Sequence, residues 1–419
     1  MRRAIGIGTA LLACLACMSS SAAAAPRYDA HTVIVKYANG ATSSQRSLSA
    51  RLAGVLETLG SVRGIGAQVV RVSGDPAAVA KRLGRSQGVL YAEPNYFARA
   101  TGVPNDPRFA GQYALHNSGQ GGGAADADID APEGWTTRFG ATSFPSTGGA
   151  KVGIVDTGVL AGHEDLAGKV VNCAGVRSFG IDVLGMITLP IFADATIVNG
   201  RCADDNGHGT HVAGIAAANA NNGRGIAGVA FDSPLAICKA LDRNGAGPVA
   251  GIANCIGYLA ANGARVISMS LGTNVDSVTL RNAVIAASSS ALVVAASGNT
   301  GTNVPQYPAF YPEAVSVAAT DNRDQRAVFS TFNGDVEVAA PGANILSTSN
   351  NGGYKVISGT SMATPHAAGV AAVIAGRYPS QTPTFWRGKL DSAVDDVAAA
   401  GRDQQTGFGR VNLQQAATE

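Results

Sequence analysis

The chain has 419 residues, of which 46% are hydrophobic and 14% are charged, and its formal net charge at pH 7 is +2. This length accommodates one large domain and a smaller one, and the apolar content excludes a chain that is disordered as a whole. The charge is divided unevenly, because residues 27–100 carry +6 and residues 101–419 carry −6. The basic charge is not gathered with aromatic residues on the larger part, which argues against nucleic-acid binding. Opposite charges are compatible with docking of the two parts on each other.

Residues 1–24 have the three-part pattern of a secretory signal peptide. Two arginines precede an apolar run, and the alanines at 22–24 give the cleavage pattern, with a cut after Ala25 as the near alternative. The same apolar run allows a second interpretation, in which Cys14 carries a lipid anchor. No later apolar run approaches the ~20 residues of a membrane span. We therefore expect a secreted, extracellular protein, with transit through a periplasm as an option, and no membrane partner.

Residues 25–100 predict a small α+β domain. The alternating HTVIVKY, the apolar GAQVVRV at 66–72 and a last segment at 88–92 are typical of strands. A polar stretch after the first strand and a segment that begins at Asp75-Pro76 favour helices. The order strand–helix–strand–strand–helix–strand would pack as a ferredoxin-like unit.

Residues 101–419 predict a second domain of α/β class, after a linker and loop rich in Gly, Pro, Asn and Asp at 98–125. Beyond residue 150, apolar runs such as KVGIVD, SPLAICKAL and ALVVAASGN alternate with helical segments. This alternation indicates a parallel β-sheet with helices on both faces. The segment 174–201 is interpreted as a loop insertion that could wall a substrate cleft. The glycine-rich GQGGGA near residue 121 lacks the context of a nucleotide-binding loop.

Four cysteines remain once a signal peptide is removed: Cys173, Cys202, Cys238 and Cys255. An even number in an exported protein indicates two disulfides. Three pairings are open, and we favour the two local ones, Cys173–Cys202 and Cys238–Cys255. A zinc site is an alternative, but no C-x-x-C spacing supports it.

Parallel sheets bind ligands at the carboxyl ends of their strands, and polar residues follow several of the apolar runs here. Asp156 ends one run, and Asn299 follows another. His208 opens HGTHVAGIAAAN, and Ser361 lies in GTSMATPHAAG, where a helix is expected to begin. A serine at a helix start is often only an N-cap. Yet a hydroxyl, an imidazole, a carboxylate and an amide donor are the four groups that acyl transfer to water requires.

The motifs VDTG, GHGTHVAG and GTSMATPHAAG resemble the triad signatures of the subtilisin-like serine protease (subtilase) family, in the family's order. The resemblance covers residues 104–415 and implies a subtilisin-like fold. It places the orienting acid on Asp156, the general base on His208 and the nucleophile on Ser361. Asn299 matches the oxyanion-hole amide. We therefore expect a secreted serine endopeptidase that needs no cofactor for its chemistry.

The same resemblance implies how a peptide substrate binds. Ser270, Leu271 and Gly272 resemble the family's substrate-binding strand, which pairs with an extended peptide by β-augmentation. Gly272 and Gly298 would flank the pocket for the residue before the cleaved bond and leave space for a sizeable apolar side chain. Gln306 departs from the glycine often found near the floor of that pocket, so the depth of the pocket is left open.

Two further implications concern the proenzyme and calcium. Residues 25–100 resemble the family's inhibitory propeptide, which would act as an intramolecular chaperone and be removed by self-cleavage near residues 99–104. Asp165, with the loop Asn221-Asn222-Gly223, lies where subtilases often bind structural calcium. Oxygen ligands of this kind suit a hard cation. Protein or peptide substrates and the chain's own propeptide are the expected partners of a monomer.

Three alternatives to a serine protease stay open or are set aside. An aspartic protease needs two carboxylates that share a proton, and the chain has no second DTG segment. A catalytically inactive peptide-binding homologue would lack one of the four catalytic groups, all of which are present. A transpeptidase or peptide cyclase on the same fold would resolve the acyl-enzyme with an amine, and no feature of the sequence indicates that water is excluded.

Overall fold

The computed structural model describes residues 28–96, 103–137, 149–183 and 187–418, and within these ranges it describes only the backbone of residues 30, 136–137 and 178–194. The chain divides into two compact units, Met1–Arg99 and Ala100–Glu419. The expected signal peptide, its cleavage positions and most of the expected processing region near 99–104 lie outside the described residues. No helix in the described part has the length and apolarity that crossing a membrane requires.

The first unit has the predicted strand–helix–strand–strand–helix–strand order. Its elements are β1 (Tyr28–Tyr37), α1 (Ser43–Ala53), β2 (Val55–Val62), β3 (Ala67–Val72), α2 (Pro76–Gly84) and β4 (Val89–Tyr96). The strands pair antiparallel in the order β2-β3-β1-β4, which is a ferredoxin-like sheet. Thr42 forms a capping box with Gln45 at the start of α1, and Asp75 caps α2 ahead of Pro76. The strand β2 escaped the sequence analysis because most of its side chains are exposed.

The second unit is built on a ten-stranded sheet with the order β15-β16-β12-β11-β10-β9-β5-β8-β6-β7. The strands from β16 to β6 in this order run parallel to their neighbours, and β15 and β7 are antiparallel edge strands. The strands are β5 (Val152–Asp156), β6 (Val170–Val183), β7 (Ile187–Asn199), β8 (Leu235–Lys239), β9 (Val266–Met269), β10 (Leu292–Ala296), β11 (Ala314–Thr320), β12 (Val338–Pro341), β15 (Val394–Asp395) and β16 (Arg410–Val411). A separate antiparallel pair comprises β13 (Ile345–Thr348) and β14 (Tyr354–Ile357).

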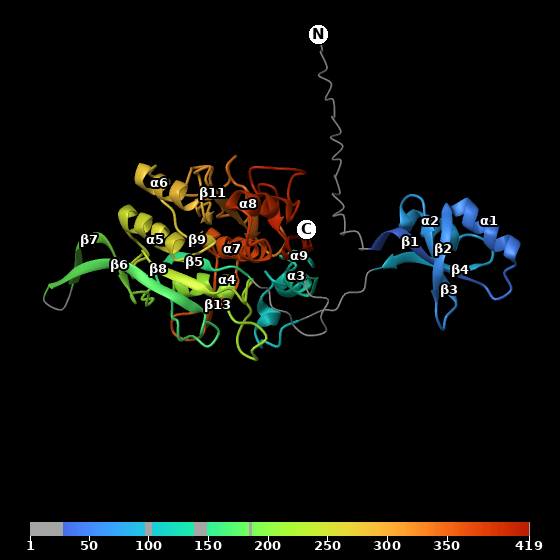
Figure 1. Ribbon diagram of the computed structural model, residues 1–419, viewed down its shortest axis with the longest axis horizontal. Helices are drawn as coiled ribbons and strands as arrows, with labels where there is room; N and C mark the ends of the chain where they lie inside the picture. Colours follow the sequence, from blue (N-terminus) through green and yellow to red (C-terminus); the bar gives the residue numbers. More distant parts are fainter. Residues whose placement is uncertain (1–27, 97–102, 138–148, 184–186, 419) are drawn as a thin grey trace, which may run out of the picture. The chain divides into compact units, whose positions relative to one another are not determined.

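Helices cover both faces of this sheet, as predicted (Figure 1). Alternate side chains of β10 show the two faces. Leu292 and Val294 belong to the core with α4 (His208–Ala217) and α7 (Thr360–Arg377). Val293 and Ala295 belong to the core with α5 (Val249–Ala261) and α6 (Val278–Ala287). The helices and short 3₁₀ turns are η1 (Phe109–Gly111), η2 (Gln120–Gly122), α3 (Ala131–Thr137), α4 (His208–Ala217), α5 (Val249–Ala261), α6 (Val278–Ala287), α7 (Thr360–Arg377), α8 (Pro383–Ser392) and α9 (Leu413–Thr418).

The segment 174–201 is not a loop, and this part of the sequence analysis was wrong. It forms most of the antiparallel hairpin β6–β7, with register pairs from Ala174↔Asn199 to Val183↔Ile187 (Figure 1). Its residues include many of the β-branched and aromatic types that strands favour. The disulfide Cys173–Cys202 closes the base of the hairpin, and Cys238–Cys255 joins β8 to α5. These are the two local pairings that the sequence favoured.

Candidate active site

Asp156 is a buried carboxylate at the carboxyl edge of the sheet. It ends β5, whose five residues are all buried, and it is itself fully inaccessible. The backbone N–H of Thr157 donates to its Oδ1 at 2.7 Å. The chain turns at Gly158 with φ of +114°, where a Cβ would lie 2.6 Å from the carbonyl oxygen of Cys202. Only glycine is free of strain at such a turn.

His208 is the first residue of α4 and faces this carboxylate. Its Nδ1 lies 2.8 Å from Oδ1 and 3.0 Å from Oδ2 of Asp156. Because a carboxylate only accepts, Nδ1 carries the proton and Nε2 of the neutral ring is left as an acceptor. The close approach depends on Gly209, where a Cβ would lie 2.2 Å from the carbonyl oxygen of Gly158. The His208 side chain is 26% exposed and that of Asp156 is 0% exposed, so the ring extends from the buried acid toward solvent.

Ser361 is the second residue of α7, and its hydroxyl does not cap that helix. The N-cap is Gly359, which makes no side-chain capping hydrogen bond. Ser361 Oγ donates to the carbonyl oxygen of Ser270 at 3.2 Å, and Ser270 Oγ donates to the carbonyl oxygen of Ser361 at 2.8 Å. The described residues include no hydrogen bond between Ser361 and His208. Such bonds are often long or misaligned in enzymes without substrate, and rotation about one Cα–Cβ bond redirects this hydroxyl.

Asn299 lies beside the start of the same helix. Its Oδ1 accepts from the backbone N–H of Thr360 at 2.8 Å and from the hydroxyl of Thr360 at 2.9 Å. An N–H can only donate, so these contacts fix which end of the amide is oxygen. The Nδ2 donor therefore faces the other way, and it lies 3.4 Å from the position that a Cβ of Gly359 would take. This amide is thus presented next to the residues that flank Ser361.

A cavity of about 520 Å³ opens beside His208 and Ser270. Its wall includes His208, the sequence-predicted segment Ser270–Gly272, and the side chains of Leu241, Val249 and Ile252. Ser361 does not line this cavity, but it is hydrogen-bonded to Ser270, which does. The sequence analysis missed the wall formed by residues 241–252, although the small residues Gly-Ala-Gly at 245–247 mark a segment that can approach a ligand closely.

Gln306 occupies the space between Gly272 and Gly298. A Cβ on Gly298 would lie 2.4 Å from Cγ of Gln306, and a Cβ on Gly272 would lie 3.5 Å from its Oε1. Gly298 has φ of +111°, and its N–H donates to the Thr360 hydroxyl at 3.2 Å. The two glycines flank a common space, but the Gln306 side chain fills part of the room that they leave.

The carboxylate of Asp165 is buried and has protein donors on both oxygens. Oδ1 accepts from Nδ2 of Asn222 at 3.0 Å, and Oδ2 accepts from Ile226 N–H at 2.9 Å and from Tyr354 OH at 2.8 Å. A second acid, Asp106, accepts from the N–H groups of Asn221 and Asn222 at 2.6 and 3.2 Å. Burial, and to a lesser degree the charge of Asp165, raises the pKa of Asp106.

No group of three or more His, Cys, Asp or Glu side chains in the described part of the chain is arranged to hold a metal ion. Asp106 was not predicted from the sequence, because its segment Asn-Asp-Pro is typical of a loop. A site at this position would have to rest on two carboxylates together with amide and backbone oxygens, which are ligands that Ca²⁺ accepts.

Comparison with known proteins decides the family. Residues 147–409 match the Subtilase family, and residues 18–95 match the fervidolysin N-terminal prodomain. The chain belongs to the subtilase family. This subtilase is therefore a serine endopeptidase with an N-terminal prodomain, as its motifs predicted, and Asp156, His208, Asn299 and Ser361 all lie inside the matched segment.

Named relatives agree with this assignment. The subtilase is 41% identical over 316 residues to thermitase of Thermoactinomyces vulgaris, an alignment that covers 75% of this chain and 99% of thermitase. It is 38% identical over 274 residues to subtilisin DY of Bacillus licheniformis, covering 64% of this chain and 90% of that protein. Among solved structures, sphericase is similar at 35% identity with a TM-score of 0.58, covering 67% of this chain and 97% of its own. A protease of Pseudoalteromonas arctica PAMC 21717 is similar at 31% identity and a TM-score of 0.61, covering 75% and 98%.

Proposed function

We propose that this subtilase hydrolyses peptide bonds through an acyl-enzyme on Ser361, with His208 as general base, Asp156 as the orienting acid and Asn299 as the oxyanion donor. The observation that carries the proposal is the pair of contacts from His208 Nδ1 to the buried carboxylate of Asp156, at 2.8 and 3.0 Å. They leave Nε2 as the basic nitrogen on the partly exposed side of the ring.

The proposed reaction begins when the hydroxyl of Ser361 turns from Ser270 to Nε2 of His208. As Oγ attacks the carbonyl carbon of the substrate, Nε2 takes the hydroxyl proton, and Asp156 stabilises the imidazolium that forms. The carbonyl oxygen becomes an oxyanion, which accepts a hydrogen bond from Nδ2 of Asn299 at the positive end of α7. Collapse breaks the C–N bond, and His208 returns the proton to the leaving amine.

Deacylation repeats these steps with water in place of the hydroxyl. His208 takes a proton from the water, which attacks the ester carbon, and Ser361 Oγ leaves with that proton. The products are a carboxylic acid and an amine, and no redox partner or cofactor is required. The open cavity in front of Ser270 and Gly272 supports access of water and of an extended peptide.

We propose that substrates pair with residues Ser270–Gly272, which follow the carboxyl end of β9. Leu271 and Gly272 line the cavity, which supports pairing of an extended peptide along this segment. Gln306, between Gly272 and Gly298, would favour residues of small or medium size before the cleaved bond.

Export and self-processing complete the proposal. The first unit is a ferredoxin-like domain that matches the fervidolysin prodomain, and it exposes large apolar side chains, among them Leu56 at 63% and Leu90 at 65%. We infer that the prodomain binds the catalytic domain until cleavage near 99–104, and that the mature enzyme is a secreted monomer.

Calcium is proposed as a structural ion at Asp106 and Asp165. The raised pKa of Asp106 reflects burial and the neighbouring charge of Asp165, a repulsion that a divalent cation would remove. When bound, the ion would supply positive charge to the segment around Asp106, near the start of the second unit, and to the loop at 221–226. It would take no part in the chemistry.

Expression of the full chain beside its Ser361→Ala variant tests the proposal. We expect the wild type to lose residues 25–100 after export and to digest casein, and the variant to remain a folded, unprocessed precursor without activity. A folded wild type that neither processes itself nor digests casein would instead be a peptide-binding homologue. Mass analysis of peptide products separates hydrolysis from ligation, because a cyclase joins ends that a protease leaves free.

A further inference from the structure

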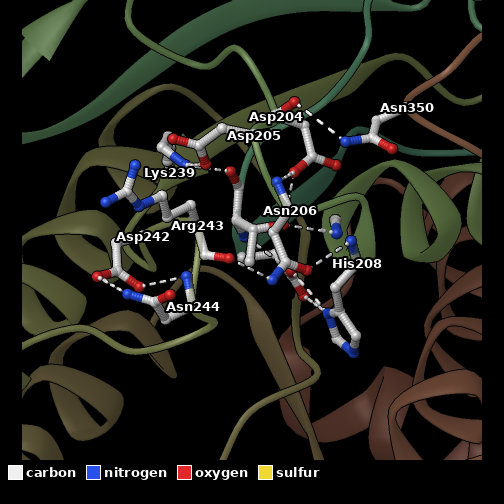
Figure 2. Close-up of polar contacts among 12 residues, drawn as sticks. Asp204, Asp205, Asn206, His208, Lys239, Asp242, Arg243, Asn244 and Asn350 are labelled. Carbon is white, nitrogen blue, oxygen red and sulfur yellow. Dashed lines mark hydrogen bonds and ion pairs between the residues drawn. The ribbon is translucent and has the colours of Figure 1, made fainter. Parts of the chain in front are cut away.

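Asp204 is a second carboxylate close to the proposed general base, and it accepts an unusual number of hydrogen bonds (Figure 2). Its Oδ1 accepts from the Thr157 hydroxyl at 2.9 Å and from the N–H groups of Asn206 and Gly207 at 3.0 and 2.8 Å. Its Oδ2 accepts from the N–H of Thr210 at 2.9 Å and from the Thr210 hydroxyl at 2.6 Å. One side chain thus organises the whole turn that leads into α4.

The same carboxylate connects this turn to the end of β5. Thr157, which donates to Asp204, directly follows Asp156 in the chain and donates its N–H to the Asp156 carboxylate at 2.7 Å. The Thr157 hydroxyl also accepts from the N–H of Gly209 at 2.9 Å. Asp204 is therefore bonded, directly or through Thr157, to residues on both sides of the contact between Asp156 and His208.

Asp204 carries a full negative charge at this position. Burial opposes its ionisation, but the hydrogen bonds from Thr210 and from the backbone outweigh burial and lower its pKa. The charge lies at the N-terminal end of α4, where an anion is favoured. Burial lowers the pKa of His208, the charges of Asp156 and Asp204 raise it, and the charge of Lys355 lowers it. His211, one turn along α4, is kept neutral because burial lowers its pKa to about 3.

We propose that Asp204 is a positioning residue of the active site: it fixes the turn that presents His208 to Asp156, and its charge stabilises the imidazolium form of His208 while Ser361 is acylated. This inference rests on the proposed function, because it gives His208 the role of general base. It adds a residue outside the three motifs, which ordinary inspection of the sequence would class as a loop aspartate.

Three variants separate the two parts of this role. Asp204→Asn removes the charge and disturbs the hydrogen bonds, Asp204→Glu keeps the charge but displaces it, and Thr210→Val removes one hydroxyl donor and leaves the charge in place. Asp205→Asn is the matched control, because it removes an equal charge from the next residue in the chain. The side chain of Asp205 is 55% exposed and pairs with Lys239 (Figure 2). Exposed charges are screened by solvent and salt.

Each variant is expressed as the full chain and allowed to process itself. The experiment then measures kcat and KM on a peptide anilide from pH 5 to pH 9, with active sites counted by a fluorophosphonate. We expect Asp204→Asn to lower kcat about tenfold with little change in KM. In this variant the acidic limb of the kcat/KM profile should move to lower pH by roughly half a unit or more. A negative charge near an imidazole raises the pKa of the imidazole, so removal of the charge lowers it. Asp204→Glu and Thr210→Val should also lower kcat, but their acidic limbs of kcat/KM should lie closer to that of the wild type. Asp205→Asn should match the wild type in both kcat and the acidic limb.

An acidic limb of Asp204→Asn that coincides with that of Asp205→Asn, together with an unchanged kcat, would overturn the inference. If Asp204→Asn does not fold, Thr210→Val decides: an unchanged kcat would show that the turn needs no such support. A wild type without hydrolysis or labelling would refute the proposed function itself, so the two failures are distinguishable.

Discussion

The Oδ1 atom of Asn299 accepts two hydrogen bonds from Thr360, one from its N–H and one from its hydroxyl, at 2.8 and 2.9 Å. Thr360 immediately precedes Ser361, so the amide that would hold the oxyanion and the hydroxyl that would attack are fixed to the same turn of α7. A change at Thr360 should therefore affect both groups.

Asn299→Ala should lower kcat and leave KM nearly unchanged, because the donor acts on charge that appears only in the transition state. Loss of one such donor reduced kcat about 10²–10³-fold in a subtilisin, a known value that we expect to apply here. Steady-state kinetics on a peptide anilide measures the effect. Asn303→Ala, an exposed amide in the same loop, is the control. Equal kcat values for the two variants would remove Asn299 from the oxyanion hole.

Gln306→Gly should widen the pocket between Gly272 and Gly298. A set of anilides with Ala, Leu or Phe before the cleaved bond should then show a gain of about 10-fold in kcat/KM for Phe relative to Ala, since one buried apolar group contributes roughly 1–3 kcal/mol. Gly298→Ala is the opposite change: its Cβ would lie 2.4 Å from Gln306 Cγ at a φ of +111°. We expect that variant to lose activity, and an unchanged preference in Gln306→Gly would exclude Gln306 from the pocket.

The midpoint of the acidic limb of the kcat/KM profile should lie at a higher pH than the ordinary pKa of an imidazole. Burial disfavours the charged form of His208, but the charge and hydrogen bond of Asp156 outweigh it and raise the pKa of His208. The general base must be neutral, so activity should fall as the pH drops through a midpoint above about 6.5. Lys355 acts in the opposite direction, and Lys355→Met should move the midpoint higher at low salt, an effect that 1 M salt should reduce. A midpoint that moves lower in this variant would contradict the assigned electrostatics.

Calcium should stabilise the catalytic domain through Asp106 and Asp165. With the inactive Ser361→Ala chain, which avoids self-digestion, calcium at about 100 times its Kd should add roughly 2.7 kcal/mol to the free energy of unfolding. Scanning calorimetry with calcium and with a chelator measures the difference. Asp106→Asn in the same background should abolish it, and Asp335→Asn, an exposed acid, should retain it. An equal calcium effect in the two variants would place the ion elsewhere.

Removal of the disulfide Cys173–Cys202, by alanine at both positions, should lower the free energy of unfolding by about 3.5 kcal/mol in the chain-entropy description. The bond spans 29 residues, and Cys238–Cys255 spans 17. The shorter loop should give a smaller loss, about 3 kcal/mol. Urea unfolding of the two double variants in the Ser361→Ala background tests the order, and a larger loss for Cys238–Cys255 would contradict it.

The sequence predicted the layers of the fold, because they follow from local patterns, and the resemblance of its motifs to a family supplied the candidate residues of the site. Apolar runs with helices between them define a parallel sheet, and the residues that follow β5, β9 and β10 had to lie on one edge. The hairpin β6–β7 was missed since its apolar strands resemble an insertion until their pairing is known. The hydrogen bond from Ser361 to Ser270 depends on a rotamer, and sequence carries little information on it.

Residues whose roles depend on contacts in space could not be predicted from the sequence either. Asp204 and Asp106 lie in loops of ordinary composition, and only their partners distinguish them: five hydrogen bonds for Asp204, and a neighbouring carboxylate for Asp106. Gln306 was noticed as a departure from the family, but its contacts with Gly272 and Gly298 came from the structure.

The central claim is that Ser361 is made nucleophilic by His208 and Asp156. The most direct measurement is peptide mass spectrometry of the self-processed enzyme after reaction with a fluorophosphonate, compared with the same enzyme carrying His208→Ala and processed by added wild type. We predict one adduct per molecule, on Ser361, in the enzyme with His208, and almost none without it. An adduct on another residue, or equal labelling of Ser361 when His208 is absent, would contradict the account.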